Sequence, residues 1–168
     1  MGNSNTELLD NINDIIEDFS VAMLTSIDVN NKLSACPMTL VCHEEETGIV
    51  YFATSEQAGK VSDIENNPHA ALTFQSNTQF VSLSGMASIS NDRELIHKLF
   101  KPAWEAWFPE GPGQEDIRLI KFNADQGEYW DMSGFYGLKF LWNAGKAILH
   151  DEKIAVDDDP ESHGKVVM

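Results

Sequence analysis

A chain of 168 residues with 42% hydrophobic residues is long enough for one domain with a sizeable core, which argues against global disorder. Its formal net charge of −16, from 27 acidic and 11 basic residues, argues against nucleic acid and anionic membranes as partners. No apolar run approaches the roughly 20 residues of a membrane-spanning helix. The polar, acidic start MGNSNTELLDNINDI is unlike a signal peptide.

The two cysteines of the chain are expected to stay unpaired. Cys36 and Cys42 lie in one predicted strand and on the same face of it, about 20 Å apart, which is beyond disulfide reach. Thiols that cannot pair suit a reducing compartment, so we expect a cytoplasmic location. The five histidines show no zinc-ligand spacing, and we expect no metal site.

The predicted elements begin with an amphipathic helix over residues 6–17, because apolar residues from Leu8 to Phe19 recur at helical spacing. Short strands separated by turns follow. The predicted strands cover residues 21–28, 33–42, 49–53, 70–74, 80–89, 117–123 and 127–132.

The segment between the third and fourth strands combines a turn, a helix and a lysine. After the strand 49–53, Thr54 and Ser55 lead into a helix with Ala58, Val61 and Ile64 on one face, and Asn66-Asn67-Pro68 ends it. Ser55 is a candidate N-cap. Two hydroxyls at a helix N-terminus, with Lys60 nearby, favour a phosphate. The alternative is an ordinary capped turn with a solvated lysine.

The second half of the chain continues the pattern. The strand 80–89 alternates apolar and serine residues, and Gly85 within it indicates a bulge or a close backbone approach. Asn91 and Glu94 form a predicted capping box that opens a helix. Pro102 ends that helix, and a short helical turn is expected around Trp104–Trp107. A weaker helical pattern covers residues 138–150.

Together these elements predict an α+β, mainly β fold. Six or seven hairpin-linked strands with inserted helices are typical of an antiparallel barrel with peripheral helices. We expect one domain over residues 1–150, including the N-terminal helix, and an acidic C-terminal tail over residues 151–168.

The order of motifs along the chain is specific. It runs from a strand with Pro37-Met38 through YFATSEQAGKV, NNPHAALTF, FVSLSGMA, AWFPEG and GEYWD. This order, over residues 19–131, resembles the pyridoxamine 5′-phosphate oxidase-like FMN-binding split-barrel family, and within it the general stress protein branch. The resemblance implies a six-stranded antiparallel split β-barrel that forms a homodimer, with FMN in clefts between the two subunits.

The resemblance also implies a set of cofactor-binding residues. Thr54, Ser55 and Lys60 would hold the flavin phosphate, in agreement with the anion site favoured by the local sequence. The other candidates lie beside the flavin ring or, in part, reach in from the partner chain. They are Cys36, Pro37, Met38, Thr39, Phe52, Ala53, Gln75, Ser76, Phe80 and Trp130.

One position departs from the family pattern. The residue before Pro-Met is usually arginine in this branch, whereas this chain has Cys36. If that arginine touches the cofactor, a bond worth about 1.5–3 kcal/mol is missing, and flavin occupancy would be weak or partial. No basic cluster for a second phosphate is present, and no closing segment with a substrate-binding arginine. The vitamin B6 oxidase activity is therefore not expected.

The resemblance predicts an FMN-dependent oxidoreductase that acts on a small substrate, with the chemistry carried by the flavin. The sequence identifies no catalytic side chain, substrate or electron donor. Two alternatives remain open: a flavin-binding stress-response protein without turnover, and a dimeric scaffold without cofactor. FAD or a deazaflavin could replace FMN, whereas haem is disfavoured because no histidine falls in the predicted cleft strands.

Overall fold

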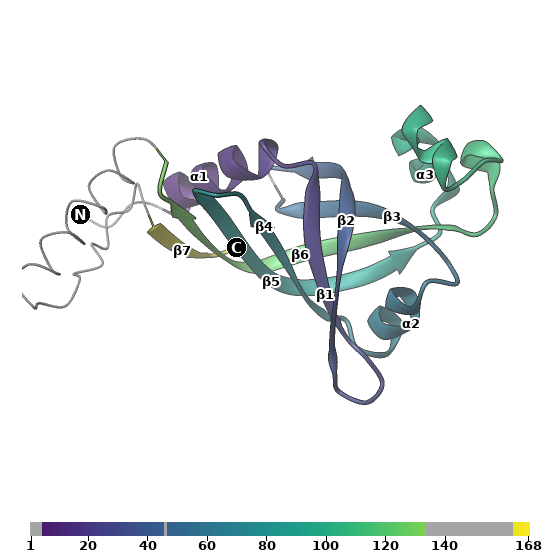
Figure 1. Ribbon diagram of the computed structural model, residues 1–168, viewed down its shortest axis with the longest axis horizontal. Coiled ribbons are helices and arrows are strands. Elements are labelled where there is room, and N and C mark those ends of the chain that lie inside the picture. Colours follow the sequence, from purple (N-terminus) through teal and green to yellow (C-terminus); the bar gives the residue numbers. More distant parts are fainter. Residues whose placement is uncertain (1–4, 46, 134–162) are drawn as a thin grey trace, which may run out of the picture.

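Over the described residues 5–45, 47–133 and 163–168, the computed structural model is a mainly β fold of seven strands and three α-helices (Figure 1). The α-helices are α1 (Asn5–Glu17), α2 (Gly59–Asn66) and α3 (Arg93–Leu99), and the 3-10 helices are η1 (Pro102–Ala106) and η2 (Gly111–Gly113). The strands are β1 (Val21–Ile27), β2 (Leu33–Glu44), β3 (Ile49–Ser55), β4 (His69–Gln75), β5 (Gln79–Ser90), β6 (Ile117–Asp131) and β7 (His163–Val167).

The first six strands form the closed antiparallel barrel that the sequence predicts. They follow the order β3-β2-β1-β4-β5-β6, and a further pairing of β6 with β3 closes the ring. One edge of β6 pairs with β5, and the other edge pairs with β3 over Ile117–Asn123 and with β7 over Gln126–Trp130. The strand β6 therefore runs from the barrel, at one end, to the extra strand β7 at the other (Figure 1).

The prediction of two separate strands over 117–123 and 127–132 is wrong, because β6 is one strand of 15 residues. Its ladder with β5 shifts register between Ser84 and Gly85, where Gly85 pairs with Ala124 and Ser84 pairs with Gln126. Asp125 is the extra residue of this β-bulge, which absorbs the polar stretch that resembles a turn in the sequence. The close backbone approach expected at Gly85 is confirmed, since a Cβ there would collide with the Asn123 carbonyl oxygen.

Replacing Gly85 with alanine is expected to lower the free energy of unfolding by about 1–3 kcal/mol, because the added methyl group meets backbone that cannot move freely. Gly113→Ala is the matched control, since a Cβ there meets nothing within 4 Å. Urea unfolding curves measure both variants. Equal stability of Gly85→Ala and Gly113→Ala would contradict the bulge geometry.

Two hydrophobic clusters support the fold. The main core fills the barrel and includes Ile12, Ile15 and Ile16 of α1, which cover one end of it. The second cluster lies between β2, β3 and β6 and the segment that carries α3 and η1, with Trp104 and Phe108 at its centre. The aromatic rings of Phe100, Trp104 and Phe108 contact one another there, with centroids 5.3 and 6.5 Å apart. Trp104 and Phe108 of this loop are thus core residues, whereas Trp107 is 69% exposed.

A bulge in β2 separates the two cysteines. The ladder between β2 and β3 shifts register between Leu40 and Cys42, which reverses the alternation of side chains. Cys36 packs against the main core and Cys42 against the second cluster. The prediction that both face the same side is therefore wrong. Both are free cysteines within the described residues.

The other predicted helices and strands can also be compared with the structure. The cap of α3 is Asp92, whose carboxylate accepts from the Leu95 N–H at 3.0 Å, so the capping box predicted from Asn91 is wrong by one residue. The N-terminal helix and the helical turn after Pro102 are confirmed. The sequence does not predict β7, which pairs with β6 and buries Val166 in the main core. The helix predicted over 138–150 lies outside the described residues.

In the ranges that the structure describes, each helix is too short or too polar to cross a membrane. The same ranges hold no group of three His, Cys, Asp or Glu side chains arranged to bind a metal ion.

His43 follows the β2 bulge and lines a hollow of about 480 Å³ between α1, β2 and Lys101. Its Nδ1 atom is buried and has no hydrogen-bond partner among the residues that the structure describes. Burial lowers the pKa of the imidazole below 6.5, because the charged form loses solvation, and the Glu17 carboxylate opposes this shift more weakly.

The lowered pKa of His43 predicts a pH-dependent stability. As the pH falls below 6.5, the unfolded chain takes up a proton that the folded chain resists, so the free energy of unfolding decreases down to the folded-state pKa. We expect His43→Gln to show a smaller loss than the native chain between about pH 7.5 and about pH 5.5. The exposed His97 gives the control His97→Gln, which should behave like the native chain. An identical pH dependence of both variants would contradict this role of His43.

Candidate functional site

The strand β2 has an open edge at the segment Cys36–Thr39. This segment pairs with β1, but β2 pairs with β3 only from Leu40, which lies opposite Phe52. The Leu40 N–H donates to the Ser20 carbonyl oxygen at 2.9 Å, so the backbone groups of Pro37 and Thr39 turn by alternation to the open edge. Because proline has no N–H, the Thr39 N–H is the hydrogen-bond donor that this pair offers.

The side chains of this segment divide between the core and the surface. Met38 is 7% exposed and belongs to the main core, and by the same alternation its N–H and C=O groups turn to β1, away from the open edge. Cys36 is half-buried against the same core, while Pro37 and Thr39 are exposed.

The strand β3 leaves β2 at this point and continues along β6. Phe52 is fully buried in the main core and Thr54 is 6% exposed, while Ala53 packs in part against the second cluster. Thr54 pairs with Arg118 and Ser55 with Ile117. The two strands that carry candidate residues therefore part just beyond the Leu40–Phe52 pair, and the β3–α2 turn begins where they part.

Ser55 does not cap α2, and that prediction is wrong. The helix begins at Gly59 after Ala58, whose side chain makes no capping bond. A turn closed by the Ala58 N–H on the Ser55 carbonyl oxygen, at 3.0 Å, separates the serine from the helix. The Ser55 hydroxyl donates instead to Asp116 Oδ2 at 2.7 Å, and it accepts from the Gln57 N–H at 3.4 Å.

Lys60 is the second residue of α2. Val61 and Ile64 anchor the helix in the core, and the predicted end at Asn66 is confirmed. Lys60 is half-buried and makes no ion pair with any residue that the structure describes. The β3–α2 turn therefore joins Thr54, Ser55 and Lys60 through a short stretch of chain at the start of a helix, whose dipole favours an anion. The Val61 N–H is already bonded to the Ala58 carbonyl oxygen at 2.9 Å.

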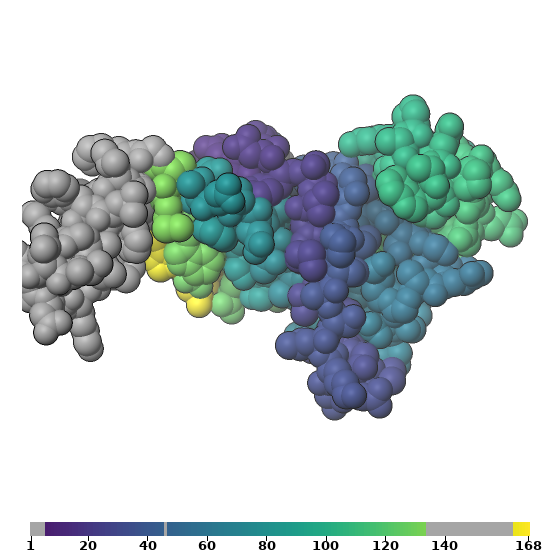
Figure 2. Space-filling model, viewed as in Figure 1, coloured from purple at the N-terminus to yellow at the C-terminus, as the bar shows by residue number. Residues whose placement is uncertain are grey.

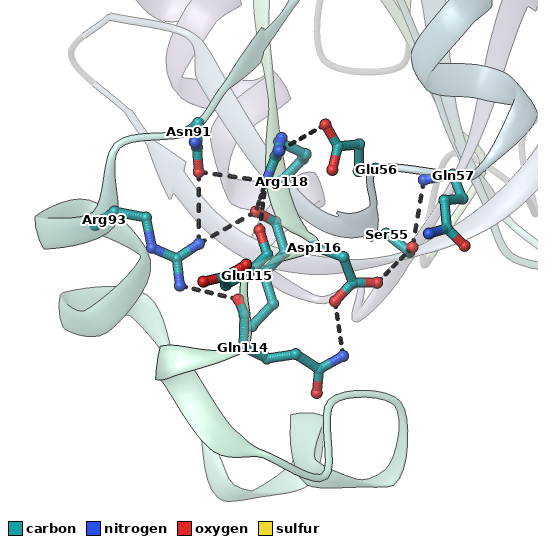
Figure 3. Close-up of polar contacts among 10 residues, drawn as sticks. Ser55, Glu56, Gln57, Asn91, Arg93, Gln114, Glu115, Asp116 and Arg118 are labelled. Atoms are coloured by element: carbon teal, nitrogen blue, oxygen red, sulfur yellow. Dashed lines mark hydrogen bonds and ion pairs between the residues drawn. The ribbon is translucent and has the colours of Figure 1, made fainter.

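A polar network holds this turn against the start of β6 (Figure 3). Asp116 accepts from Ser55 on one carboxylate oxygen and from Gln114 Nε2, at 2.7 Å, on the other. These hydrogen bonds, that from Ser55 first, lower the pKa of the Asp116 carboxyl. Arg118 forms an ion pair with Glu56 at 2.7 Å. Sequence reasoning misses Asp116 and Arg118. Asp116 does not stand out among 27 acidic residues, and no spacing in the sequence links either residue to Ser55.

Phe80 and Trp130 lie near the opposite end of β6 from the partner of Ser55. Gln75 pairs with Phe80, and Phe80 pairs with Trp130 near the end of β6. Ser76 lies in the turn between β4 and β5, where its hydroxyl accepts from the Gln79 N–H at 2.9 Å. Ser55 pairs with the first residue of β6, so about 40 Å of strand separates it from Trp130 at ~3.3 Å per residue. Within one chain, Ser55 and Trp130 are therefore not brought together.

Trp130 also contacts the extra strand β7. Its indole stacks on the imidazole of His163, with ring centroids 5.5 Å apart and an interplanar angle of 15°. His163 Nε2 lies 2.9 Å from Glu128 Oε1. The sequence places His163 in an acidic tail and contains no signal for this contact.

The barrel and the β3–α2 turn define a split-barrel protein, and comparison with known proteins agrees. The chain belongs to the family described as pyridoxamine 5′-phosphate oxidase like, whose model matches residues 7–155. Of the curated proteins, Protein bli-3 of Neurospora crassa is 34% identical over 100 residues, and General stress protein 26 of Bacillus subtilis is 30% identical over 76 residues. These matches cover 56% and 42% of this chain and 47% and 52% of the relatives. The chain thus spans about half the length of these relatives.

Solved structures show the same fold. General Stress Protein 26 from Bacillus anthracis is 29% identical with a TM-score of 0.66, and the match covers 73% of this chain and 93% of that one. A general stress FMN/FAD binding protein from Xanthomonas citri is 23% identical with a TM-score of 0.65, covering 75% and 89%. The resemblance to the general stress branch of this family is confirmed.

Proposed function

We propose that this protein binds FMN as a homodimer and transfers hydride or electrons to or from a small substrate. One observation carries the proposal: β2 and β3 part beyond the Leu40–Phe52 pair and leave the open edge of Cys36–Thr39 beside the β3–α2 turn. The turn offers Ser55 and Lys60 to a phosphate, and the edge offers the Thr39 N–H to a ring. The name of the Xanthomonas citri structure, a general stress FMN/FAD binding protein, supports a flavin as the ligand.

The residues present fit a flavin phosphate in part. Lys60 and the start of α2 favour an anion, whereas the Asp116 carboxylate next to Ser55 opposes one. When bound, FMN would supply the redox chemistry. The protein would hold the phosphate, orient the ring along β2 and tune it through the Thr39 N–H. FAD is the rival cofactor, since both flavins share the ring that the edge would meet.

The proposed homodimer completes the site. Phe80 and Trp130 lie too far along the barrel from Ser55 to reach the same flavin in one chain. A partner chain that places this end of its barrel against the open edge of β2 would add them. Val21, which pairs with Thr39, is 44% exposed and gives the open edge apolar surface for such a contact. Leu33, which is 76% exposed, lies near the turn of the β1–β2 hairpin, and this hairpin projects from the body of the molecule (Figure 2).

A flavin-binding stress protein without turnover is the second candidate. Cys36 replaces the cation that usually lies at the open edge, and Arg118, which flanks the turn, is already paired with Glu56. Both features favour weak binding. We place either form in the cytoplasm, in keeping with two unpaired thiols.

Anaerobic mixing of the FMN-loaded protein with NADH or NADPH tests the proposed reaction. Loss of the oxidised flavin absorption, faster than with free FMN, is the expected result. If FMN binds and no faster reduction occurs with either nucleotide, the oxidoreductase proposal fails and the binding protein without turnover remains.

A further inference from the structure

The carboxylate of Asp116 is fixed at the β3–α2 turn by hydrogen bonds on both oxygens. Ser55 Oγ donates to Oδ2 and Gln114 Nε2 donates to Oδ1, each at 2.7 Å. The Asp116 carbonyl oxygen accepts from the Glu56 N–H, also at 2.7 Å. Asp116 therefore holds two consecutive residues of the turn: Ser55 through its side chain (Figure 3) and Glu56 through its backbone.

This contact uses the donor that a phosphate would need. A serine hydroxyl carries one proton, so Ser55 can donate to Asp116 or to a phosphate but not to both. The hydrogen bonds from Ser55 and Gln114 lower the pKa of Asp116, which keeps the carboxyl ionised at neutral pH. A phosphate next to Ser55 would therefore meet a negative charge as well as an occupied donor.

Arg118 belongs to the same network, but its guanidinium is already bound to other groups and is not free to neutralise the charge of a phosphate. Arg118 Nη2 is paired with Glu56 Oε1 at 2.7 Å, and its Nη1 donates to the carbonyl oxygens of Glu115 and Ile117 at 2.8 and 2.9 Å. Lys60 is left as the cation of the turn that has no ion pair among the described residues.

We propose that Asp116 sets the preference of this site between a phosphorylated and an unphosphorylated flavin, by competing with the phosphate group for the Ser55 hydroxyl. The inference rests on the proposed flavin site. Asp116 is a specificity residue here: it lowers the affinity for FMN and leaves the affinity for riboflavin, which carries no phosphate, almost unchanged.

The test is titration calorimetry of the native chain and Asp116→Asn with FMN and with riboflavin. Asparagine keeps the shape and has no charge, and with its oxygen accepting from Gln114 its NH2 group faces Ser55, so the Ser55 proton is free for a phosphate. We expect the preference for FMN over riboflavin to rise about 10- to 100-fold, the range of a hydrogen bond to a charged group. Glu115→Gln is the matched control, since it makes the same change in net charge one residue away and should leave the preference unchanged.

A double-mutant cycle with Ser55→Ala identifies the route of the effect. If Asp116 acts through the Ser55 hydroxyl, Asp116→Asn should raise the FMN preference much less when Ser55 is alanine. A native-like melting temperature of each variant shows that it is folded. Failure of the native chain to bind either flavin would overturn the proposed function itself. Binding of both flavins with no difference between Asp116→Asn and Glu115→Gln would overturn the role of Asp116 alone.

Discussion

Alanine at position 60 is expected to weaken FMN binding by about 1–3 kcal/mol, or roughly 5- to 150-fold in Kd. Lys60 is the second residue of α2 and brings an ammonium group to the first turn of the helix, where the helix dipole also favours an anion. The loss should appear for FMN and not for riboflavin, because the ammonium group meets the phosphate only.

Two features of the chain make this experiment specific. Lys98, an exposed residue in the last turn of α3, gives the control Lys98→Ala with the same change in net charge. Lys60 is not in the hydrophobic core, so its removal leaves the packing of Val61 and Ile64 in place. Fluorescence quenching of the flavin measures Kd for all variants. An unchanged Kd for FMN in Lys60→Ala would remove this residue from the phosphate site.

Arginine at position 36 is expected to tighten FMN binding about 10- to 100-fold, because it restores a charge-assisted hydrogen bond at the open edge of β2. Cys36 is half-buried at the margin of the main core, so the longer side chain can extend past that margin and place its guanidinium outside. The gain in affinity should be the same for FMN that co-purifies with the protein and for FMN that is added after purification.

Cys36→Met is the control for length, since methionine lengthens the side chain without a charge. Equilibrium titration with FMN gives the affinities, and thermal melting of the free proteins checks that both variants fold. If Cys36→Arg binds FMN no more tightly than Cys36→Met, the missing cation is not what limits the affinity of this chain.

Local sequence patterns predicted the elements that local interactions build. The helix α2 follows from the spacing of Val61 and Ile64 and from the stop at Asn66-Asn67-Pro68, and the structure agrees. The alternation in β5 likewise identified its buried face. Gly85 marked a close approach to a strand about 40 residues further along the chain, because only a residue without a Cβ fits there.

The features that the sequence could not predict depend on distant partners. Ser55 looks like a helix cap, but its hydroxyl binds Asp116, which lies 61 residues away. The polar stretch before Gly127 looks like a turn, but its pairing with β5 and the bulge keep β6 continuous. The strand β7 exists because β6 offers a free edge beyond β3, a property of the barrel rather than of the residues His163–Val167.

The same difference between local and distant features applies to the candidate site. Thr54, Ser55 and Lys60 lie together because they are close in sequence, so a local pattern could group them. The register of β6 alone reveals that Phe80 and Trp130 lie at the far end of the barrel from Ser55. The family resemblance predicts that a partner chain contributes residues to the site. The strand register supplies the physical reason for that expectation.

Equilibrium dialysis of the purified protein against FMN, read by visible absorption, tests the central claim most directly, since it detects weak as well as tight binding. The proposed site predicts saturation at one FMN per chain, with a flavin spectrum shifted from that of free FMN. Equal FMN concentrations on both sides of the membrane, at protein concentrations well above the micromolar range, would contradict flavin binding and leave the dimeric scaffold as the account of this chain.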